Sequence, residues 1–332
     1  MSKDIYLCPM LILLDCRPLQ RPGPDSEKTR FLLSCAAGLT AQEGVHWIFL
    51  LDQGGRALSL PAGEKATARK VLWPVARIVR KYHADLIMMT DGRLAGGTKV
   101  PQCCWIPGKA DDKVLEKMGA ARAVLCFGDK TNKEVFPGVF TVPPAPDEGI
   151  TPLSMEAREA VKGRVADGKE YFYTDIAGAP QSGVINLLKA FSLFKKRQLS
   201  NMKLVLGGEG DPGIAEKLDS YKYRQDVSLV PKVEGDLIGG AYGAISLERR
   251  GSLGIDVLNA WKARVPVITA ADREGVLRVP ADDPASLADG LKSLYKDESL
   301  RNGLIEKAAL IVADLSLRQS VTTIWDAIGR NQ

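Results

Sequence analysis

Residues 244–269 read AISLERRGSLGIDVLNAWKARVPVIT, and this stretch decides the fold class that we predict from the sequence. A short apolar strand runs into a loop that contains glycine, and a helix opens near Gly254. A second apolar strand follows at 265–270. A strand, a loop at a helix start and a second strand form one βαβ unit, so the stretch indicates a parallel sheet covered by helices.

The same alternation of strands and helices extends along the first half of the chain. Apolar runs predict strands at 11–15, 45–52, 85–90, 102–106, 123–127 and 139–142, and helical spacing predicts helices at 27–40, 64–82 and 111–118. Pro74 lies inside the second of these helices. It should kink or restart that helix, because proline lacks the backbone N–H.

The pattern repeats after a stiff polar stretch, PPAPDEG at 143–149. We predict strands at 171–175, 203–206, 227–230, 243–247, 265–269 and 276–279, and helices at 183–196, 214–221, 254–263, 284–295, 300–314 and 317–328. Two successive α/β halves favour two Rossmann-like domains, 1–145 and 146–332, with the last helix packing back on the first domain. A single large α/β domain is the alternative.

The composition is that of a globular protein, and it limits the classes of ligand. Of 332 residues, 45% are hydrophobic and 26% charged, and the net charge of +5 suits an anionic small ligand or a weak membrane-surface contact. No nucleic-acid-binding module is visible, so we expect no nucleic acid partner. Six cysteines without CxxC spacing indicate buried, reduced thiols and a cytoplasmic protein, and two histidines disfavour a histidine-rich metal site.

The N-terminal apolar run is too short to span a bilayer. It fits a first buried strand better than a signal peptide.

Five short motifs follow one another in the second half of the chain. They are GVINLLKAF at 183–191, KLVLGGEG at 203–210, DVSLVP at 226–231, VPVI at 265–268 and DPASLA at 283–288. In this order and spacing they resemble the donor domain of family 4 glycosyltransferases (glycosyl transferases group 1). The LDCRPLQ stretch at 14–20 resembles the opening of many members. The resemblance implies an α/β fold of GT-B architecture, with two facing Rossmann-like domains built on parallel sheets.

The resemblance also implies a basic pair that neutralises the leaving diphosphate of the donor. The matching positions, 175–177 and 182, hold no basic residue. Lys189 and Lys195 lie on the following helix, where we expect them on the solvated face.

Two glutamates separated by seven residues contact the donor in the family, one at the sugar and one at the ribose. Alignment on Ala260 and the Val265-Pro266 pair places them at Gly251 and Asn259. Asn259 retains an amide that can hydrogen-bond a ribose hydroxyl.

A second register uses Glu248 and Asp256, which have the same spacing and are our candidates for a catalytic pair. An acid at 256 is equally explained by the first turn of a helix, where the macrodipole favours a negative charge.

Backbone groups complete the predicted donor site. Gly207 and Gly208 let the chain approach a ligand closely. Ser252 and Leu253 stand at the start of the helix near Gly254, where N–H groups can bind a diphosphate. We therefore expect a nucleotide-diphosphate sugar as substrate or ligand, with no cofactor and no metal.

A basic stripe runs along the predicted helix at 64–82, opposite an apolar side. Such a helix can make a peripheral contact with an anionic membrane. It is also what an ordinary covering helix of a parallel sheet looks like.

The sequence leaves several functions open. One is a retaining, metal-independent glycosyltransferase that moves a sugar from a nucleotide-diphosphate donor to a saccharide or lipid-linked acceptor in envelope polysaccharide synthesis. It would be cytoplasmic, with the option of a place at the inner membrane face. The alternative is a catalytically degenerate GT-B protein that binds a nucleotide sugar or a partner subunit. A nucleotide-sugar epimerase of the same fold is a third reading.

Overall fold

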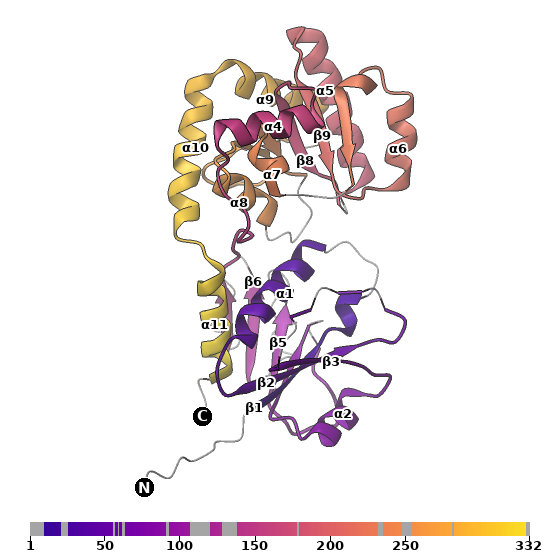
Figure 1. The fold of residues 1–332 in the computed structure, drawn as a ribbon, viewed down its shortest axis with the longest axis vertical. Coiled ribbons are helices and arrows are strands. Elements are labelled where there is room, and N and C mark those ends of the chain that lie inside the picture. The colour runs from indigo at the N-terminus through magenta and orange to yellow at the C-terminus, as the bar shows by residue number, and fades with distance from the viewer. Residues whose placement is uncertain are drawn as a thin grey trace. The chain divides into compact units, whose positions relative to one another are not determined.

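The computed structural model describes residues 10–20, 26–55, 57–58, 60–61, 64–90, 93–106, 120–127, 138–177, 179–231, 235–247, 254–280 and 282–329. The chain divides into two compact units, each of which layers helices on a sheet (Figure 1). The first unit comprises Met1–Gly23, Glu27–Pro144 and Leu317–Gln332, and the second comprises Pro24–Ser26 and Ala145–Ser316. Parallel strands and flanking helices in both units confirm the predicted α/β class.

The described part of the first unit contains a seven-stranded sheet in which all neighbours pair in parallel. Its strands are β1 (Met10–Asp15), β2 (Val45–Leu51), β3 (Ala66–Lys70), β4 (Leu86–Met89), β5 (Gln102–Ile106), β6 (Ala123–Phe127) and β7 (Val139–Val142), in the order β3-β2-β1-β4-β5-β6-β7. After β1 the chain adds β2 and β3 on one side of that strand, and it then crosses over to place β4 on the other side of β1. A ligand crevice is therefore expected at the carboxyl ends of β1 and β4.

Helices cover both faces of this sheet. A short 3-10 helix, η1 (Arg17–Gln20), precedes α1 (Ser26–Thr40), and α2 (Val75–Tyr82) packs through Val75, Ile78 and Val79 into one buried cluster. The last helix, α11 (Leu317–Gly329), lies on β7 and β6. It meets α1 where Gly38 leaves room for Val321, because a Cβ on that glycine would lie 2.6 Å from the valine side chain.

The predicted helix at 64–82 is wrong over its first half. Residues 66–70 form the edge strand β3, which pairs in parallel with β2, and α2 begins only at Val75. Pro74 is the residue before α2, so it restarts the chain as a helix rather than kinking a longer one. The predicted helix at 111–118 lies outside the described residues.

The described part of the second unit contains a six-stranded parallel sheet. Its strands are β8 (Tyr171–Asp175), β9 (Lys203–Gly207), β10 (Val227–Val230), β11 (Gly243–Ile245), β12 (Val267–Thr269) and β13 (Leu277–Arg278), in the order β10-β9-β8-β11-β12-β13. The order reverses between β8 and β11, which places a second expected crevice at their carboxyl ends.

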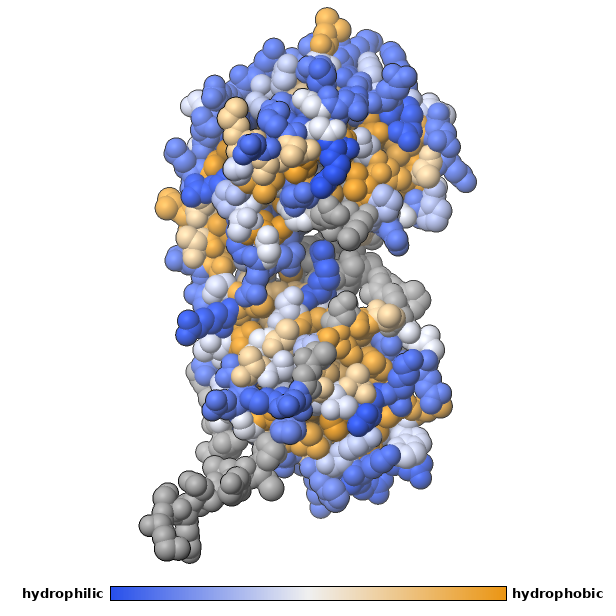
Figure 2. All heavy atoms as spheres, viewed as in Figure 1, coloured by the Kyte–Doolittle hydropathy of each residue, from blue (hydrophilic) through white to orange (hydrophobic). Residues whose placement is uncertain are grey.

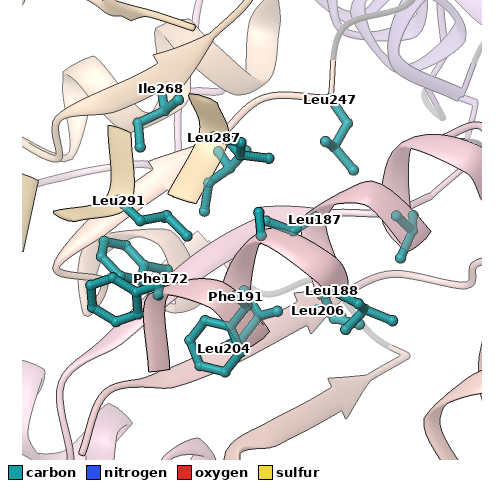
Figure 3. Close-up of a cluster of buried hydrophobic side chains, with 14 of the residues drawn as sticks. Phe172, Leu187, Leu188, Phe191, Leu204, Leu206, Leu247, Ile268, Leu287 and Leu291 are labelled. Atoms are coloured by element: carbon teal, nitrogen blue, oxygen red, sulfur yellow. The ribbon is translucent and has the colours of Figure 1, made fainter. Parts of the chain in front are cut away.

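Side chains alternate between the two faces of this sheet and form two cores. One core packs α5 (Gln181–Gln198), α6 (Pro212–Asp219) and α9 (Pro284–Lys296) on the face that carries Phe172. Figure 3 shows Phe172 and Leu204 from the strands against Leu187 and Phe191 of α5. The other core packs α4 (Met155–Val165), α7 (Gly235–Gly239), α8 (Ile255–Lys262) and α10 (Glu298–Ala313) on the opposite face.

Local capping explains where several of these helices begin. Asp283 accepts hydrogen bonds from the N–H groups of Ala285 and Ser286, and Pro284 fits the first helical position, as predicted for this motif. Sequence patterns missed α4, α7 and the 3-10 helix η2 (Arg224–Asp226). The first of these begins behind a Ser154 cap that accepts from the Ala157 N–H.

The cysteines confirm the expectation of buried thiols. Within the described residues, Cys16, Cys35, Cys103, Cys104 and Cys126 are all buried and free of disulfides. Burial raises the pKa of the Cys103 thiol to about 11, which keeps it protonated at neutral pH. Among the described helices, none is long and apolar enough to cross a membrane.

Candidate functional site

The carboxyl edge of the second sheet, at its switch point, brings together polar side chains from several elements. Asp175 ends β8, Ser246 follows β11, and Asp256 lies in the first turn of α8. Arg273 comes from the loop between β12 and β13. Open parallel sheets bind ligands at such an edge, so we take these four residues as the core of the candidate site.

Asp256 is the residue whose ionisation the site alters most clearly. Burial raises the pKa of its carboxyl, while the Ser246 hydroxyl and the Val257 N–H, which lies 2.9 Å from Oδ1, oppose that shift. The nearby Asp175 carboxylate raises the pKa further, and the Arg273 guanidinium lowers it. Two carboxyls and one guanidinium therefore act on one another at this edge.

Arg273 lies directly against the start of α8. Gly254 precedes the helix with a φ of 67°, and a Cβ placed on it would lie 2.6 Å from Nη1 of Arg273. A helix N-terminus carries a partial positive charge, and a cation beside it adds to that charge. Positive charge from both sources suits an anionic ligand such as a phosphate group.

The predicted glycines of the donor site are tightly packed. A Cβ on Gly207 would lie 2.6 Å from the Tyr173 hydroxyl. Gly208 has a φ of 92°, and a Cβ there would lie 2.8 Å from the Cβ of Ala177. Asp175 fixes this turn by accepting from the Ala177 N–H at 2.8 Å. Both glycines therefore have packing reasons to be glycine, and a donor contact through them stays a prediction.

Asn259 is buried and binds within the second unit. Its Oδ1 accepts from the Asp147 N–H and its Nδ2 donates to Asp147 Oδ2, each at 2.8 Å. Lys262, one turn later, donates to the Asp147 carbonyl at 3.0 Å. These bonds use one acceptor position and one donor of the Asn259 amide and fix its orientation toward Asp147.

The remaining predicted site residues, Glu248, Gly251, Ser252 and Leu253, lie outside the described residues. The choice between the two registers of the acidic pair is therefore not tested. On α8 itself, Asp256 interacts with Asp175 and Arg273, whereas Asn259 binds the linker at Asp147.

The sequence missed Asp175, Ser246 and Arg273. The first two follow directly from strand ends, so the rule that ligands bind at carboxyl ends of parallel strands would have found them. Arg273 follows β12 in a loop whose sequence carries no motif, and only the fold brings it to Gly254.

Lys189 and Lys195, both on α5, behave differently. Lys189 is exposed, as predicted. Lys195 was expected on the solvated face, and this is wrong: its Nζ is buried 3.0 Å from Asp226 Oδ2 and donates to the Met202 carbonyl at 3.1 Å. Met202 directly precedes β9, and Asp226 is the last residue of η2, just before the amino end of β10. Lys195 is therefore an internal support at the opposite edge of the sheet from the candidate site.

The first unit contains a separate cavity of about 350 Å³ at its own switch point. Asp15 at the end of β1 and Met89 at the end of β4 line it, together with Asp52 and Arg93. Arg17 forms a bidentate pair with Asp15, at 2.8 Å from Nε and 2.7 Å from Nη2. Paired charges at a strand edge suit a small ligand rich in hydroxyl groups.

The described side chains contain no group of three or more His, Cys, Asp or Glu residues that could hold a metal ion.

Comparison with known proteins places the chain among glycosyltransferase folds. Residues 158–310 match the family model of glycosyl transferases group 1. No curated protein sequence matches the chain.

Solved structures resemble the chain over almost its whole length. The crystal structure of WaaG, described as a glycosyltransferase involved in lipopolysaccharide biosynthesis, has a TM-score of 0.74 at 14% identity, covering 96% of this chain and 99% of its own. Anabaena HepE in complex with UDP and glucose has a TM-score of 0.71 at 11% identity, with 96% and 99% covered. Staphylococcus aureus MnaA with UDP has a TM-score of 0.62 at 12% identity, with 96% and 95% covered.

Proposed function

Because the chain has the GT-B architecture and its second unit is of the glycosyl transferases group 1 type, we propose that it transfers a sugar from a nucleotide-diphosphate donor bound at the carboxyl edge of the second sheet. One observation carries the proposal: the Arg273 guanidinium lies against Gly254 at the start of α8, beside the Asp175 and Asp256 carboxyls. This is where the fold expects an anionic ligand.

The proposed transfer breaks the bond between the anomeric carbon of the sugar and the diphosphate oxygen. The diphosphate keeps the electron pair, and an acceptor hydroxyl forms the new bond and gives its proton to the departing diphosphate oxygen. Charge builds on the diphosphate as the bond breaks, so placed positive charge lowers the barrier. We propose that Arg273 and the N-terminus of α8 supply this charge in place of the absent basic pair, without a metal.

The two carboxyls would position the sugar. Asp256 is easier to protonate than an ordinary aspartate, so it suits a hydrogen bond to a sugar oxygen, whereas Asp175 suits a sugar hydroxyl as an acceptor. In this proposal the Asn259 amide holds the linker and the ribose is recognised elsewhere. Glu248, Gly251, Ser252 and Leu253 remain proposed donor contacts on the sequence argument alone.

The first unit is proposed as the acceptor side, with the cavity beside Asp15 and Arg17 as the acceptor site. The same proposal includes a saccharide or lipid-linked acceptor and a role in envelope polysaccharide synthesis. It also includes a cytoplasmic location with peripheral membrane contact. We propose no nucleic acid partner.

A second function is favoured by two specific observations. Positions 175–177 and 182 hold no cation, and Asn259 is bonded to Asp147 instead of standing open to a nucleotide. A protein that binds a nucleotide sugar without transferring it would fit these substitutions.

The test is calorimetric titration of the chain with UDP-, GDP- and ADP-sugars, followed by measurement of free nucleotide released with saccharide acceptors. The proposal expects binding and release, and Arg273→Gln should weaken binding by roughly tenfold, the loss of one charge-assisted contact. The matched control is Arg278→Gln, which removes an exposed cation. This change should leave nucleotide binding unchanged. Binding without release selects the second function, and no binding to any nucleotide rejects both.

A further inference from the structure

Asp52, which lines the cavity of the first unit, has a carboxylate with no partner among the described residues. It directly follows strand β2 and is half-buried. The other acid of the cavity, Asp15, uses its carboxylate to bind Arg17, through Nε at 2.8 Å and Nη2 at 2.7 Å. A carboxylate oxygen that lines a cavity and carries no hydrogen bond can accept one from a ligand. Asp52 is therefore the acid available to a ligand in this cavity.

Gln20 fixes the backbone of Asp52. Its side chain is buried, and Oε1 accepts from the Asp52 N–H at 2.6 Å. The same loop packs on Gln20 three residues later, where a Cβ on Gly55 would lie 2.6 Å from Nε2. Because the loop is held at both places, Asp52 keeps its position without a ligand, and this lowers the entropy cost of binding one.

The loop after β4, which also lines the cavity, is held in the same way. Gln102 of β5 accepts from the Ala95 N–H at 2.7 Å and donates to the Ala95 carbonyl at 3.0 Å. Cys104, two residues along, donates from Sγ to the Arg93 carbonyl at 3.5 Å. Side chains two residues apart in a strand point to the same side of the sheet, so one face of β5 supports this loop. The cavity is thus lined by two loops whose backbones are fixed.

Much of the remaining lining is apolar, and it includes Pro18, Val75, Met89 and Leu94. The surface where α2 lies is mainly hydrophilic (Figure 2), whereas Val75, the first residue of that helix, is buried and lines the cavity. An apolar lining with a few placed polar groups is typical of small-molecule sites, and about 350 Å³ lies near the lower end of their volumes. The cavity therefore suits one small ring better than a long chain.

The charges that line the cavity balance one another. They are two carboxylates, Asp15 and Asp52, and two guanidinium groups, Arg17 and Arg93. A charged ligand would be attracted by one pair and repelled by the other, because like charges at close range disfavour binding. A neutral sugar ring has hydroxyl groups for a carboxylate and C–H groups for the apolar lining. The charge balance thus favours a neutral sugar over a uronic acid or a phosphate.

We propose that Asp52 selects a neutral sugar as the ligand of this cavity, by accepting hydrogen bonds from two adjacent hydroxyl groups of one ring. Each carboxylate oxygen accepts one of these bonds. Gln20 is a positioning residue, because it acts through the backbone of Asp52. One consequence rests on the proposed function: the bound sugar is then the terminal residue of the acceptor. Binding of the sugar itself depends neither on the donor nor on sugar transfer.

The test is titration of the full chain with methyl glycosides, followed by saturation-transfer NMR. The neutral probes are methyl glucoside, methyl mannoside and methyl galactoside, and methyl glucuronide is the charged probe. We expect at least one neutral glycoside to bind more tightly than the glucuronide. Asp52→Asn should weaken that binding by roughly tenfold, through the loss of charge-assisted hydrogen bonds. The control is Glu43→Gln, the same change of charge at an exposed position before β2, and it should leave binding unchanged.

A double-mutant cycle tests the positioning role of Gln20. Gln20→Met removes the acceptor for the Asp52 N–H and should weaken binding of the same glycoside by at least about threefold. With Asp52→Ala in place, Gln20→Met should have no further effect, since no carboxylate is left to position. An equal loss in both backgrounds would mean that Gln20 only supports the fold, and would overturn its positioning role.

Three results would overturn the role of Asp52. They are no binding of any neutral glycoside, tighter binding of the glucuronide, which would assign the ligand to Arg93, and equal effects of Asp52→Asn and Glu43→Gln. The nucleotide affinity of Asp52→Asn, expected to be unchanged, separates this site from the donor site. If the glycoside binds as expected but receives no sugar from any bound nucleotide sugar, the proposed function fails at the acceptor while the role of Asp52 stands.

Discussion

The side chain of Asn259 and Asp147 exchange two hydrogen bonds of 2.8 Å, across 112 positions of sequence. One residue lies on α8, which opens the candidate donor site, and the other lies in the proline-rich stretch where the second unit begins. Asn259, which the family resemblance assigns to a ribose contact, thus holds the start of this unit to α8.

Loss of this pair should affect stability before it affects ligand binding. Asn259→Ala leaves the partly buried Asp147 N–H without its acceptor, which should lower the free energy of unfolding by about 1–3 kcal/mol. Asp147→Ala should cost a similar amount, and the double variant less than the sum, because the two residues share the interaction. Urea denaturation measures all three. Strictly additive losses, or an Asn259→Ala variant that loses nucleotide affinity when Asp147→Ala keeps it, would contradict this role.

Asp256 should destabilise the fold at neutral pH. Burial raises its folded-state pKa above the unfolded value, so the folded chain binds the proton more tightly and the stability falls as pH rises through the interval between the two. Asp256→Asn should therefore raise the melting temperature at pH 7, by roughly 2–4 °C per kcal/mol gained. The gain should vanish in acid, where the aspartate is protonated. Calorimetric scans of both proteins across pH measure it, and a gain that does not depend on pH would refute the role of ionisation.

Gly254 is expected to tolerate no side chain. Gly254→Ala places a Cβ at a φ of 67° and 2.6 Å from the Arg273 guanidinium, so we expect a loss of about 1–3 kcal/mol and weaker nucleotide binding. The control is Gly303→Ala on α10, where a Cβ meets no atom within 4 Å. That change should stabilise the chain by about 0.5–1 kcal/mol, because alanine favours a helix interior. Thermal denaturation of both variants decides whether the backbone at 254 is constrained.

Lys195 and Lys189 offer a matched comparison on one helix. Lys195→Met removes the buried partner of Asp226 and the donor to Met202, and should cost about 1–3 kcal/mol. Lys189→Met alters an exposed position and should stay within about 0.5 kcal/mol. Chemical denaturation distinguishes them, and similar losses would mean that the Lys195 pair contributes no net stability.

Buried strands were predictable because parallel sheets covered on both faces leave continuous apolar runs. The buried strands β5, β6 and β8 have the predicted bounds, and so do the edge strands β7 and β10. The edge strand β3 was not predictable on the same ground. Its sequence, ATARK, is exposed on much of its surface and favours a helix by propensity, and only pairing with β2 makes it a strand.

The candidate site was less predictable than the fold. Its position at strand ends follows from topology, but Arg273 reaches Gly254 through a loop with no pattern of its own. The sequence correctly placed Asn259 in the helix that is α8. Its partner, Asp147, could not be inferred, because no spacing rule relates an acid in a linker to an amide on a helix.

The return of α11 to the first unit determines where the chain can be cut. Apart from Pro24–Ser26, the second unit is the continuous segment Ala145–Ser316, so this segment could be excised and expressed as one piece. The first unit could not: stopping the chain at 316 would uncover β6 and β7 and remove the Ser320 hydroxyl that donates to the Pro143 carbonyl at 2.7 Å. A fusion partner placed at the C-terminus would accordingly be joined to α11, which belongs to the first unit, although the second unit precedes α11 in the sequence.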